Sequence, residues 1–258
     1  MPNVQLFDVD GTLTRSEKDL PATISVYQTF AFWPLLSYRL SKLPVHLRTE
    51  IELWENTMKG EQDPDGSSFR MMARTVSEFL RFPLQQSEMI ACAREITQNF
   101  LLCNIVRLEA IKYICECLEK GIICILTTGS YLDGLRGFVE VLQNKHLLPR
   151  SPNLILNGAE IDWSNQTLLW ANIGAYKTTK VRQTLKDLGI TDYRITAAFG
   201  DDPYINDKGI LEMAECAFVI KCKKNEVAPF NQRFKHCSWE EFFVTYKERI
   251  LNGIPIYG

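Results

Sequence analysis

Two aspartates, Asp8 and Asp10, follow a short apolar run at residues 4–7 and are separated by one residue. In an extended strand alternate side chains point to the same side, so the two carboxylates are expected to leave the strand end together. Two like charges so close repel each other unless a cation lies between them or one of them keeps a proton. The pair therefore indicates a metal site or a shared proton.

Polar side chains also follow two later apolar runs. Thr-Thr-Gly-Ser at 127–130 comes after the run at 122–126, and Gly-Asp-Asp at 200–202 comes after the run at 193–199. Open α/β sheets bind ligands beyond the carboxyl ends of their strands. These polar groups are therefore expected to lie at the same edge of a sheet as the aspartate pair.

The chain beyond residue 105 alternates short apolar runs with helical patterns, which favours a parallel α/β sheet. Residues 16–104 show helical apolar spacing without a convincing strand. We expect an α/β core from residues 1–15 and 105–258, with 16–104 as an inserted helical domain. Strands are expected at 4–7, 122–126, 154–156, 159–163, 167–170, 193–199 and 217–220, and the later helices at 108–118, 131–147, 177–188, 210–215 and 239–251.

The motifs resemble those of the haloacid dehalogenase (HAD) superfamily. Asp-x-Asp-Gly-Thr-Leu-Thr at 8–14 is similar to motif I, and Thr128 after its apolar strand is similar to motif II. Lys177 resembles motif III, and 200–202 with Asp207 resembles motif IV. The layout looks closest to the phosphoserine-phosphatase-like branch, subfamily IB. The resemblance implies a Rossmann-like parallel-sheet core, an inserted α-helical cap of the C1 type, and a phosphatase.

The resemblance also implies how the site works. A divalent cation neutralises the repulsion between a phosphate monoester and a carboxylate nucleophile, and hard oxygen ligands suit Mg2+. A second carboxylate protonates the leaving oxygen and then activates water to cleave an aspartyl-phosphate. The implied site comprises Asp8 and Asp10 as catalytic residues, Thr128, Gly129 and Lys177 as phosphate-binding residues, Asp8, Asp10 (through its carbonyl) and Asp201 as metal ligands, and Asp202 and Asp207 as supporting residues.

The sequence departs from that family pattern at three positions. Motif II has two threonines where this branch often has a serine, and we choose Thr128 because Thr127 is expected to lie on the strand. Lys180 competes with Lys177 for the motif III position. Asp207 lies one residue farther from the motif IV glycine than usual, so Asn206 is an alternative for its supporting role.

Composition narrows the classes of partner. Lys and Arg number 29 against 31 Asp and Glu, a balance that gives no basic footprint for nucleic acid. The eight cysteines include no C-x-x-C pair, and the chain opens directly into a strand pattern, so we expect reduced cysteines in a cytoplasmic protein without a secretory signal. The apolar segment at 31–36 is too short to span a membrane; it either packs within a helix pair or forms a surface for a lipid-like substrate.

Two other functions use the same residues. A phosphotransferase or phosphomutase differs from a phosphatase only in the acceptor that reaches the intermediate. A phospho-ligand effector keeps the fold and works by binding alone. Each motif by itself has a plainer explanation, such as a turn, a surface loop or a solvated lysine, but four motifs in this order favour an enzyme acting on a phosphorylated small molecule.

Overall fold

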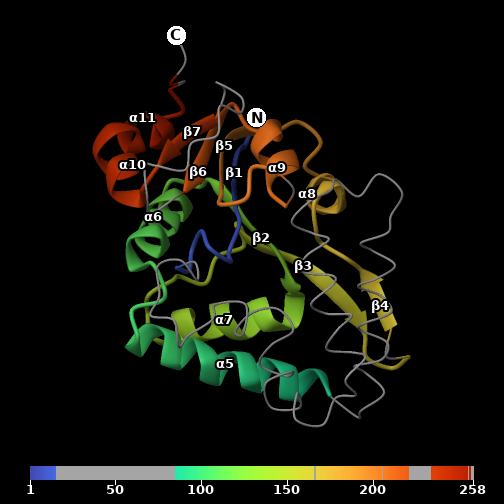
Figure 1. Ribbon diagram of the computed structural model, residues 1–258. Helices are drawn as coiled ribbons and strands as arrows, with labels where there is room; N and C mark the ends of the chain where they lie inside the picture. Colours follow the sequence, from blue (N-terminus) through green and yellow to red (C-terminus); the bar gives the residue numbers. More distant parts are fainter. Residues whose placement is uncertain (16–84, 166, 205, 221–233, 255, 257–258) are drawn as a thin grey trace.

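The computed structural model describes residues 1–15, 85–165, 167–204, 206–220, 234–254 and 256. Within these residues seven strands form one sheet in the order β4-β3-β2-β1-β5-β6-β7 (Figure 1), and all neighbours are parallel except β3 and β4. The strands are β1 (Asn3–Phe7), β2 (Ile123–Tyr131), β3 (Leu154–Asp162), β4 (Thr167–Trp170), β5 (Arg194–Gly200), β6 (Cys216–Ile220) and β7 (Phe234–Cys237). The helices are α5 (Gln86–Leu102), α6 (Leu108–Glu119), α7 (Leu132–Asn144), α8 (Ala175–Asp187), α9 (Lys208–Met213), α10 (Trp239–Thr245) and α11 (Lys247–Leu251).

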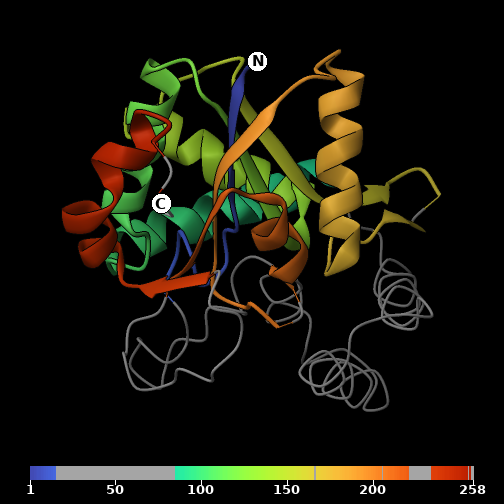
Figure 2. The same cartoon turned by 90° about the horizontal axis from the view of Figure 1, so that it is seen from above.

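Helices cover both faces of the sheet (Figure 2), and β1 shows how its residues divide between them. Val4 and Leu6 pack in the cluster that α8 and α9 complete, whereas Phe7 packs in the cluster that α6, α7 and α10 complete. All three side chains are fully buried. The alternation follows from the two-residue period of a strand and explains why the run before Asp8 is almost continuously apolar.

Three stacked aromatic rings fix the strand ends beside the predicted site. Phe7 on β1 stacks on Phe199 of β5 with centroids 4.9 Å apart, and Phe199 stacks on Phe218 of β6 at 5.1 Å. Phe7 immediately precedes Asp8, and Phe199 lies two residues before Asp201. Because these rings are buried and in contact, the carboxyl ends of β1 and β5 are held side by side.

The chain leaves and re-enters the core through a short pair of extended segments. Thr14 and Val106 form an antiparallel bridge, the Arg15 N–H donates to the Ile105 carbonyl at 2.9 Å, and the Arg107 N–H donates to the Leu13 carbonyl at 2.8 Å. The two ends of the predicted insertion therefore lie side by side. Most of residues 16–104, including the apolar segment at 31–36, lies outside the described residues, so the domain division stays a prediction.

Helix α5, the described end of that insertion, packs on α7 of the core (Figure 1). A Cβ atom on Gly137 of α7 would lie 2.7 Å from the Ala93 Cβ, so a glycine is needed for the helices to approach this closely. The sequence spacing predicts an apolar stripe of Ile90, Ala93, Ile96 and Phe100. Ala93 and Phe100 are buried together with Met89 and Thr97, whereas Ile90 and Ile96 are half-buried.

The expected α/β class and parallel sheet are confirmed, and the differences in detail are local. The expected strand at 154–156 and first hairpin strand at 159–163 form one strand, β3, which continues from parallel pairing with β2 into antiparallel pairing with β4. The expected single helix at 239–251 is two helices separated at Tyr246. Strand β7 was not predicted, because Phe-Lys-His-Cys lacks a continuous apolar run.

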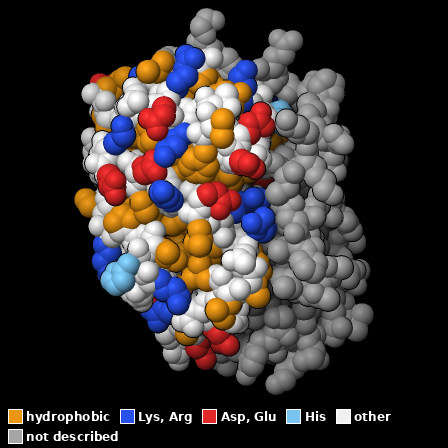
Figure 3. Space-filling model, turned by 90° about the vertical axis from the view of Figure 1, so that its left-hand side faces the viewer, with side chains coloured by type: hydrophobic (Ala, Val, Ile, Leu, Met, Phe, Trp, Pro, Cys, Tyr) orange, Lys and Arg blue, Asp and Glu red, His pale blue; other side chains and the backbone are white. Residues whose placement is uncertain are grey.

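The surface formed around α6, α10 and α11 carries acidic and basic side chains among apolar ones (Figure 3). One ion pair, between Lys247 and Glu116, joins α11 to α6 at 2.6 Å.

The seven cysteines within the described residues are free thiols. None of the described helices combines the length and the hydropathy needed to cross a membrane.

Candidate active site

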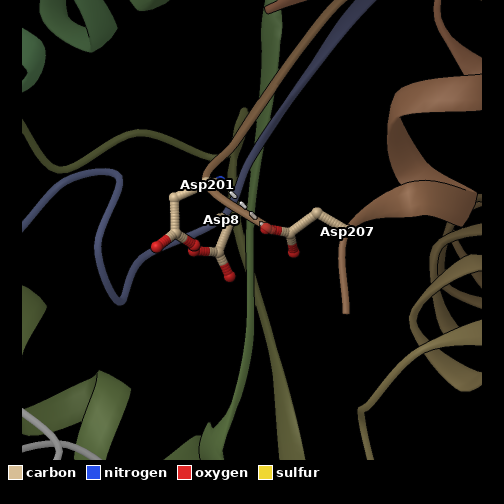
Figure 4. Close-up of side chains that lie close together, drawn as sticks. All are labelled: Asp8, Asp201 and Asp207. Atoms are coloured by element: carbon tan, nitrogen blue, oxygen red, sulfur yellow. Dashed lines mark hydrogen bonds between the residues drawn. The ribbon is translucent and has the colours of Figure 1, made fainter. Parts of the chain in front are cut away.

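The predicted residues come together at the carboxyl edge of the sheet. Carboxylate oxygens of Asp8, Asp201 and Asp207 all lie within 4.8 Å of one another. Figure 4 shows the Asp8 and Asp201 carboxylates side by side, with Asp207 on the other side of the β5 end. Asp8 follows β1 and Asp201 follows β5, two adjacent parallel strands, so the sheet topology itself brings these two side chains together.

Lys177 reaches this cluster from the first turn of α8 and is 1% exposed. Its Nζ donates to Asp8 Oδ1 at 2.6 Å and to Asp207 Oδ1 at 2.7 Å. Burial alone lowers the pKa of a lysine, but Asp207 and Asp8 overcome that effect and raise the pKa of Lys177. Lys180, the alternative from the sequence, lies elsewhere: it pairs with Glu160 and lies 5.7 Å from the Trp170 ring centroid.

Asp207 organises the loop after β5 with both of its carboxylate oxygens. Oδ1 accepts from Lys177, and Oδ2 accepts the backbone N–H groups of Asp201 and Asp202 at 3.0 and 3.1 Å. The Asp202 carboxylate instead accepts the backbone N–H groups of Tyr204 and Asn206, at 3.1 and 3.3 Å. Asp207 therefore supports the loop that presents Asp201, while Asp202 shapes the turn beyond it.

Asp8 has one oxygen left for chemistry. Its Oδ1 accepts from Lys177, whereas its Oδ2 is buried and has no hydrogen-bond partner. Burial and the neighbouring Asp207 carboxylate raise the pKa of Asp8, although Lys177 opposes them. Burial and Asp207 likewise raise the pKa of Asp201. The protein thus holds an excess of carboxylate charge that a cation would relieve.

Gly11 leaves the space that Asp201 occupies. A Cβ at position 11 would lie 2.1 Å from Asp201 Oδ2, and the Gly11 φ angle is +81°, where other residues are strained. The Gly11 N–H donates to Thr14 Oγ1, and the Thr14 hydroxyl contacts the Val9 carbonyl. The glycine and hydroxyl residues after the aspartates therefore form the tight turn that lets Asp201 approach Asp8.

Asp10 lies in different surroundings from Asp8. Its Oδ2 accepts the Thr128 hydroxyl at 2.7 Å and the Ser130 hydroxyl at 2.8 Å. Burial raises the pKa of Asp10, and the two hydroxyl hydrogen bonds reduce that rise. A carboxyl group held by hydroxyls with a raised pKa is suited to giving and taking a proton.

Thr127 and Thr128 point to different partners. Thr127 pairs with Asn157 in the β2–β3 ladder, and its hydroxyl accepts from Asn172 Nδ2 at 3.0 Å. Thr128 lies in the irregular part of β2 and contacts Asp10. Gly129 follows it, and a Cβ there would lie 3.1 Å from Ile173.

Sequence reasoning missed two residues of this region, Ser130 and Asn172. Ser130 was included only as the end of a polar run, although its spacing of two from Thr128 was a signal. Asn172 is fully buried, and its Nδ2 also donates to the Thr128 carbonyl at 2.8 Å. No signal in the sequence distinguished this asparagine from a loop residue.

The oxygens around Asp8 fit a hard divalent cation. Asp8 Oδ2 is buried without a partner beside the Asp201 carboxylate, and carboxylate oxygens are the ligands that Mg2+ prefers. Asp207 fits less well as a ligand, because its two oxygens already accept from Lys177 and from two backbone amides. The residues that would hold the ion are therefore Asp8 and Asp201.

Comparison of the fold with solved structures gives matches over nearly the whole chain. A protein with unknown function from Bordetella pertussis Tohama I matches with a TM-score of 0.59 and 17% identity, over 93% of this chain and 99% of that one. Cytosolic 5'-nucleotidase IIIB bound to cytidine matches at 0.53 and 13% identity (97% and 86%). Phosphoserine phosphatase from T. onnurineus matches at 0.51 and 18% identity (98% and 96%). The chain has the HAD fold.

The likeness lies in the fold and not in overall sequence. No family model matches the chain, and no curated protein matches it by sequence. The positions of the four motifs agree with this fold, because Asp8 and Asp201 follow adjacent parallel strands and Lys177 lies in the first turn of the helix before β5. The assignment to subfamily IB stays a prediction.

Proposed function

We propose that this protein is a magnesium-dependent phosphatase of the HAD superfamily that hydrolyses a phosphate monoester of a small molecule. The observation that carries the proposal is the Asp8 carboxylate. One of its oxygens is paired with Lys177, and the other is buried, unpartnered and beside Asp201. Lys177 fixes the direction of the Asp8 carboxylate, and the unpartnered oxygen leaves that carboxylate able to bind a cation.

In the proposed reaction the Asp8 carboxylate attacks phosphorus while the bond from phosphorus to the leaving oxygen breaks. Asp10 gives a proton to that oxygen, and an aspartyl-phosphate remains on Asp8. Asp10 then takes a proton from water, whose oxygen attacks phosphorus and releases Asp8. Lys177 and the Thr128 hydroxyl contribute charge and a hydrogen bond to the phosphoryl oxygens. Magnesium held by Asp8, Asp201 and the Asp10 carbonyl would neutralise negative charge during transfer.

The substrate is proposed only as a phosphorylated small molecule. The neighbouring structures include a phosphoserine phosphatase and a nucleotidase, two proteins with different substrates on one fold. The residues expected to select the leaving group lie in 16–104, mostly outside the described residues. A lipid-like substrate and a cytoplasmic location likewise remain proposals from the sequence.

The test is release of inorganic phosphate from an aryl phosphate with and without magnesium. We expect release that stops on chelation, returns with magnesium, and is lost in Asp8→Asn. Asp192→Asn, which changes an exposed aspartate on the turn before β5, is the matched control and should behave as wild type. Activity that survives both chelation and Asp8→Asn would contradict the mechanism, and no turnover across a panel of phosphorylated metabolites would favour the effector.

A further inference from the structure

Both hydroxyls that hold Asp10 bond the same oxygen. Thr128 Oγ1 and Ser130 Oγ lie 2.7 and 2.8 Å from Asp10 Oδ2, and neither bonds Oδ1. Thr128 is 1% exposed and Ser130 is 4% exposed, so both donors are buried, whereas the acceptor Asp10 is half-buried. The arrangement gives the two Asp10 oxygens unequal surroundings, and only Oδ1 is left without a hydroxyl donor.

Thr128 cannot serve Asp10 and a phosphate at the same time. A hydroxyl has a single proton to donate. Thr128 Oγ1 now donates it to Asp10 and also accepts the Ser130 backbone N–H at 3.0 Å. In the proposed reaction the Thr128 proton turns to a phosphoryl oxygen, and one of the two hydrogen bonds to Asp10 Oδ2 is then lost.

Ser130 is placed to keep the other hydrogen bond. Strand β2 bulges against β3: Thr127 lies opposite Asn157 and Tyr131 lies opposite Ala159, so four steps on β2 match two on β3. The bulge turns both hydroxyls toward Asp10. Gly158 permits it, because a Cβ there would lie 2.9 Å from the Ser130 carbonyl oxygen and 2.6 Å from the Leu132 nitrogen.

We propose that Ser130 is a positioning residue that holds Oδ2 of Asp10 when Thr128 turns to the phosphate, so that Oδ1 carries the proton to the leaving group. The inference rests on the proposed function and adds a residue to it. Without the Ser130 hydroxyl the Asp10 carboxyl group can rotate, and the fraction of complexes with Oδ1 aimed at the leaving oxygen falls. Proton donation is affected most, and nucleophilic attack by Asp8 is affected least.

The dependence of kcat/KM on the leaving group tests this role. 4-Nitrophenyl phosphate has a leaving group that departs with little help from an acid, whereas an alkyl phosphate such as glycerol phosphate needs protonation. For Ser130→Ala we expect kcat/KM for the alkyl phosphate to fall by about ten-fold more than for the aryl phosphate, a part of the usual effect of a general acid. The ratio of the two values does not depend on the active fraction of the sample.

Thr196→Val is the matched control. It removes another buried hydroxyl of the same sheet, which contacts the Val4 carbonyl at 3.3 Å, and should leave the ratio unchanged. Ser130→Cys places a somewhat larger side chain with a weaker donor at this position and gives the same test if the alanine variant does not fold. An unchanged ratio in an active Ser130 variant overturns the role of Ser130 alone. A wild-type protein that hydrolyses neither phosphate overturns the proposed function as well.

Discussion

Two carboxylates that are one residue apart lie in opposite kinds of environment. Asp8 is buried beside a lysine and two further aspartates, so charges surround it. Asp10 is half-buried beside two hydroxyls, so dipoles surround it. Asp8 is thereby suited to remain a metal-bound carboxylate, and Asp10 is suited to exchange a proton. The strand places them together, and their neighbours give them different chemistry.

The largest expected effect is on the charged surroundings of Asp8. Lys177→Met leaves Asp8 and Asp207 buried without their cation and should lower the free energy of unfolding by about 3–5 kcal/mol, besides abolishing activity. Urea unfolding measures it. Lys180→Met, one turn away, removes an ion pair whose partners are 21% and 31% exposed and should cost less than about 1 kcal/mol. Equal losses in the two variants would contradict the distinction.

A substitution of Asp10, which two hydroxyls surround, should lower activity and leave stability unchanged. Asp10→Asn keeps an oxygen that accepts from Thr128 and Ser130, so its unfolding midpoint should stay close to wild type. Loss of the acid and base should lower kcat by about 10²–10⁴-fold. Phosphate release and a urea titration on one preparation measure both quantities. A large drop in stability would show that Asp10, like Asp8, belongs to the charged cluster.

A smaller effect is expected at Gly11, which follows Asp10 and lies against Asp201. Gly11→Ala places a methyl group against Asp201, so half-maximal activity should require at least about ten-fold more magnesium, the loss associated with a disturbed ligand. Gly121→Ala is the matched control, since Gly121 has a φ of +74° and open space around its Cβ position. It should cost stability of about 1 kcal/mol and leave the magnesium requirement unchanged.

The metal itself, without any substitution, should give a thermal shift. At about 100 times Kd, a ligand adds about 2.7 kcal/mol to the free energy of unfolding, roughly 5–10 °C in the unfolding midpoint for a chain of this size.

The raised pKa values of Asp8 and Asp201 mean that the folded metal-free protein binds more protons than the unfolded chain above pH 3.8. Its stability therefore falls as pH rises through the folded-state pKa values, and the magnesium shift should be larger at pH 8 than at pH 5. A shift retained in Asp201→Asn would contradict the assignment of the ligands.

The sequence was sufficient for the class of fold and for the convergence of the predicted carboxylates, because parallel strands end at one edge and the residues that follow them lie close together. Asp8 and Asp201 could be placed together on that argument alone. The hydroxyl contacts of Asp10 could not be predicted in the same way. The position of Ser130 depends on a bulge in β2 that Gly158 of β3 permits, and such a register between distant segments has no local signal.

The residues that select the substrate and the domain boundary are hard to predict for a different reason. Helical spacing in residues 16–104 indicates apolar faces but does not say what they contact. Helix α5 illustrates this, because Ala93 and Phe100 of the expected stripe are buried, but Met89 and Thr97 and not the two isoleucines complete the buried face. A helix buries whichever stripe its neighbour covers, and the sequence of the helix does not identify that neighbour.

The central place of β1 has a consequence for the order in which the protein is made. Val4 pairs with Ile123 on one side and Ile195 on the other, so the strand before Asp8 is synthesised before both of its partner strands. At about 5–20 residues per second, on the order of ten to forty seconds pass before β5 exists. During this time at least one edge of this apolar strand has no partner strand. The central position that gives Asp8 its neighbours thus leaves β1 incompletely paired until β5 has been translated.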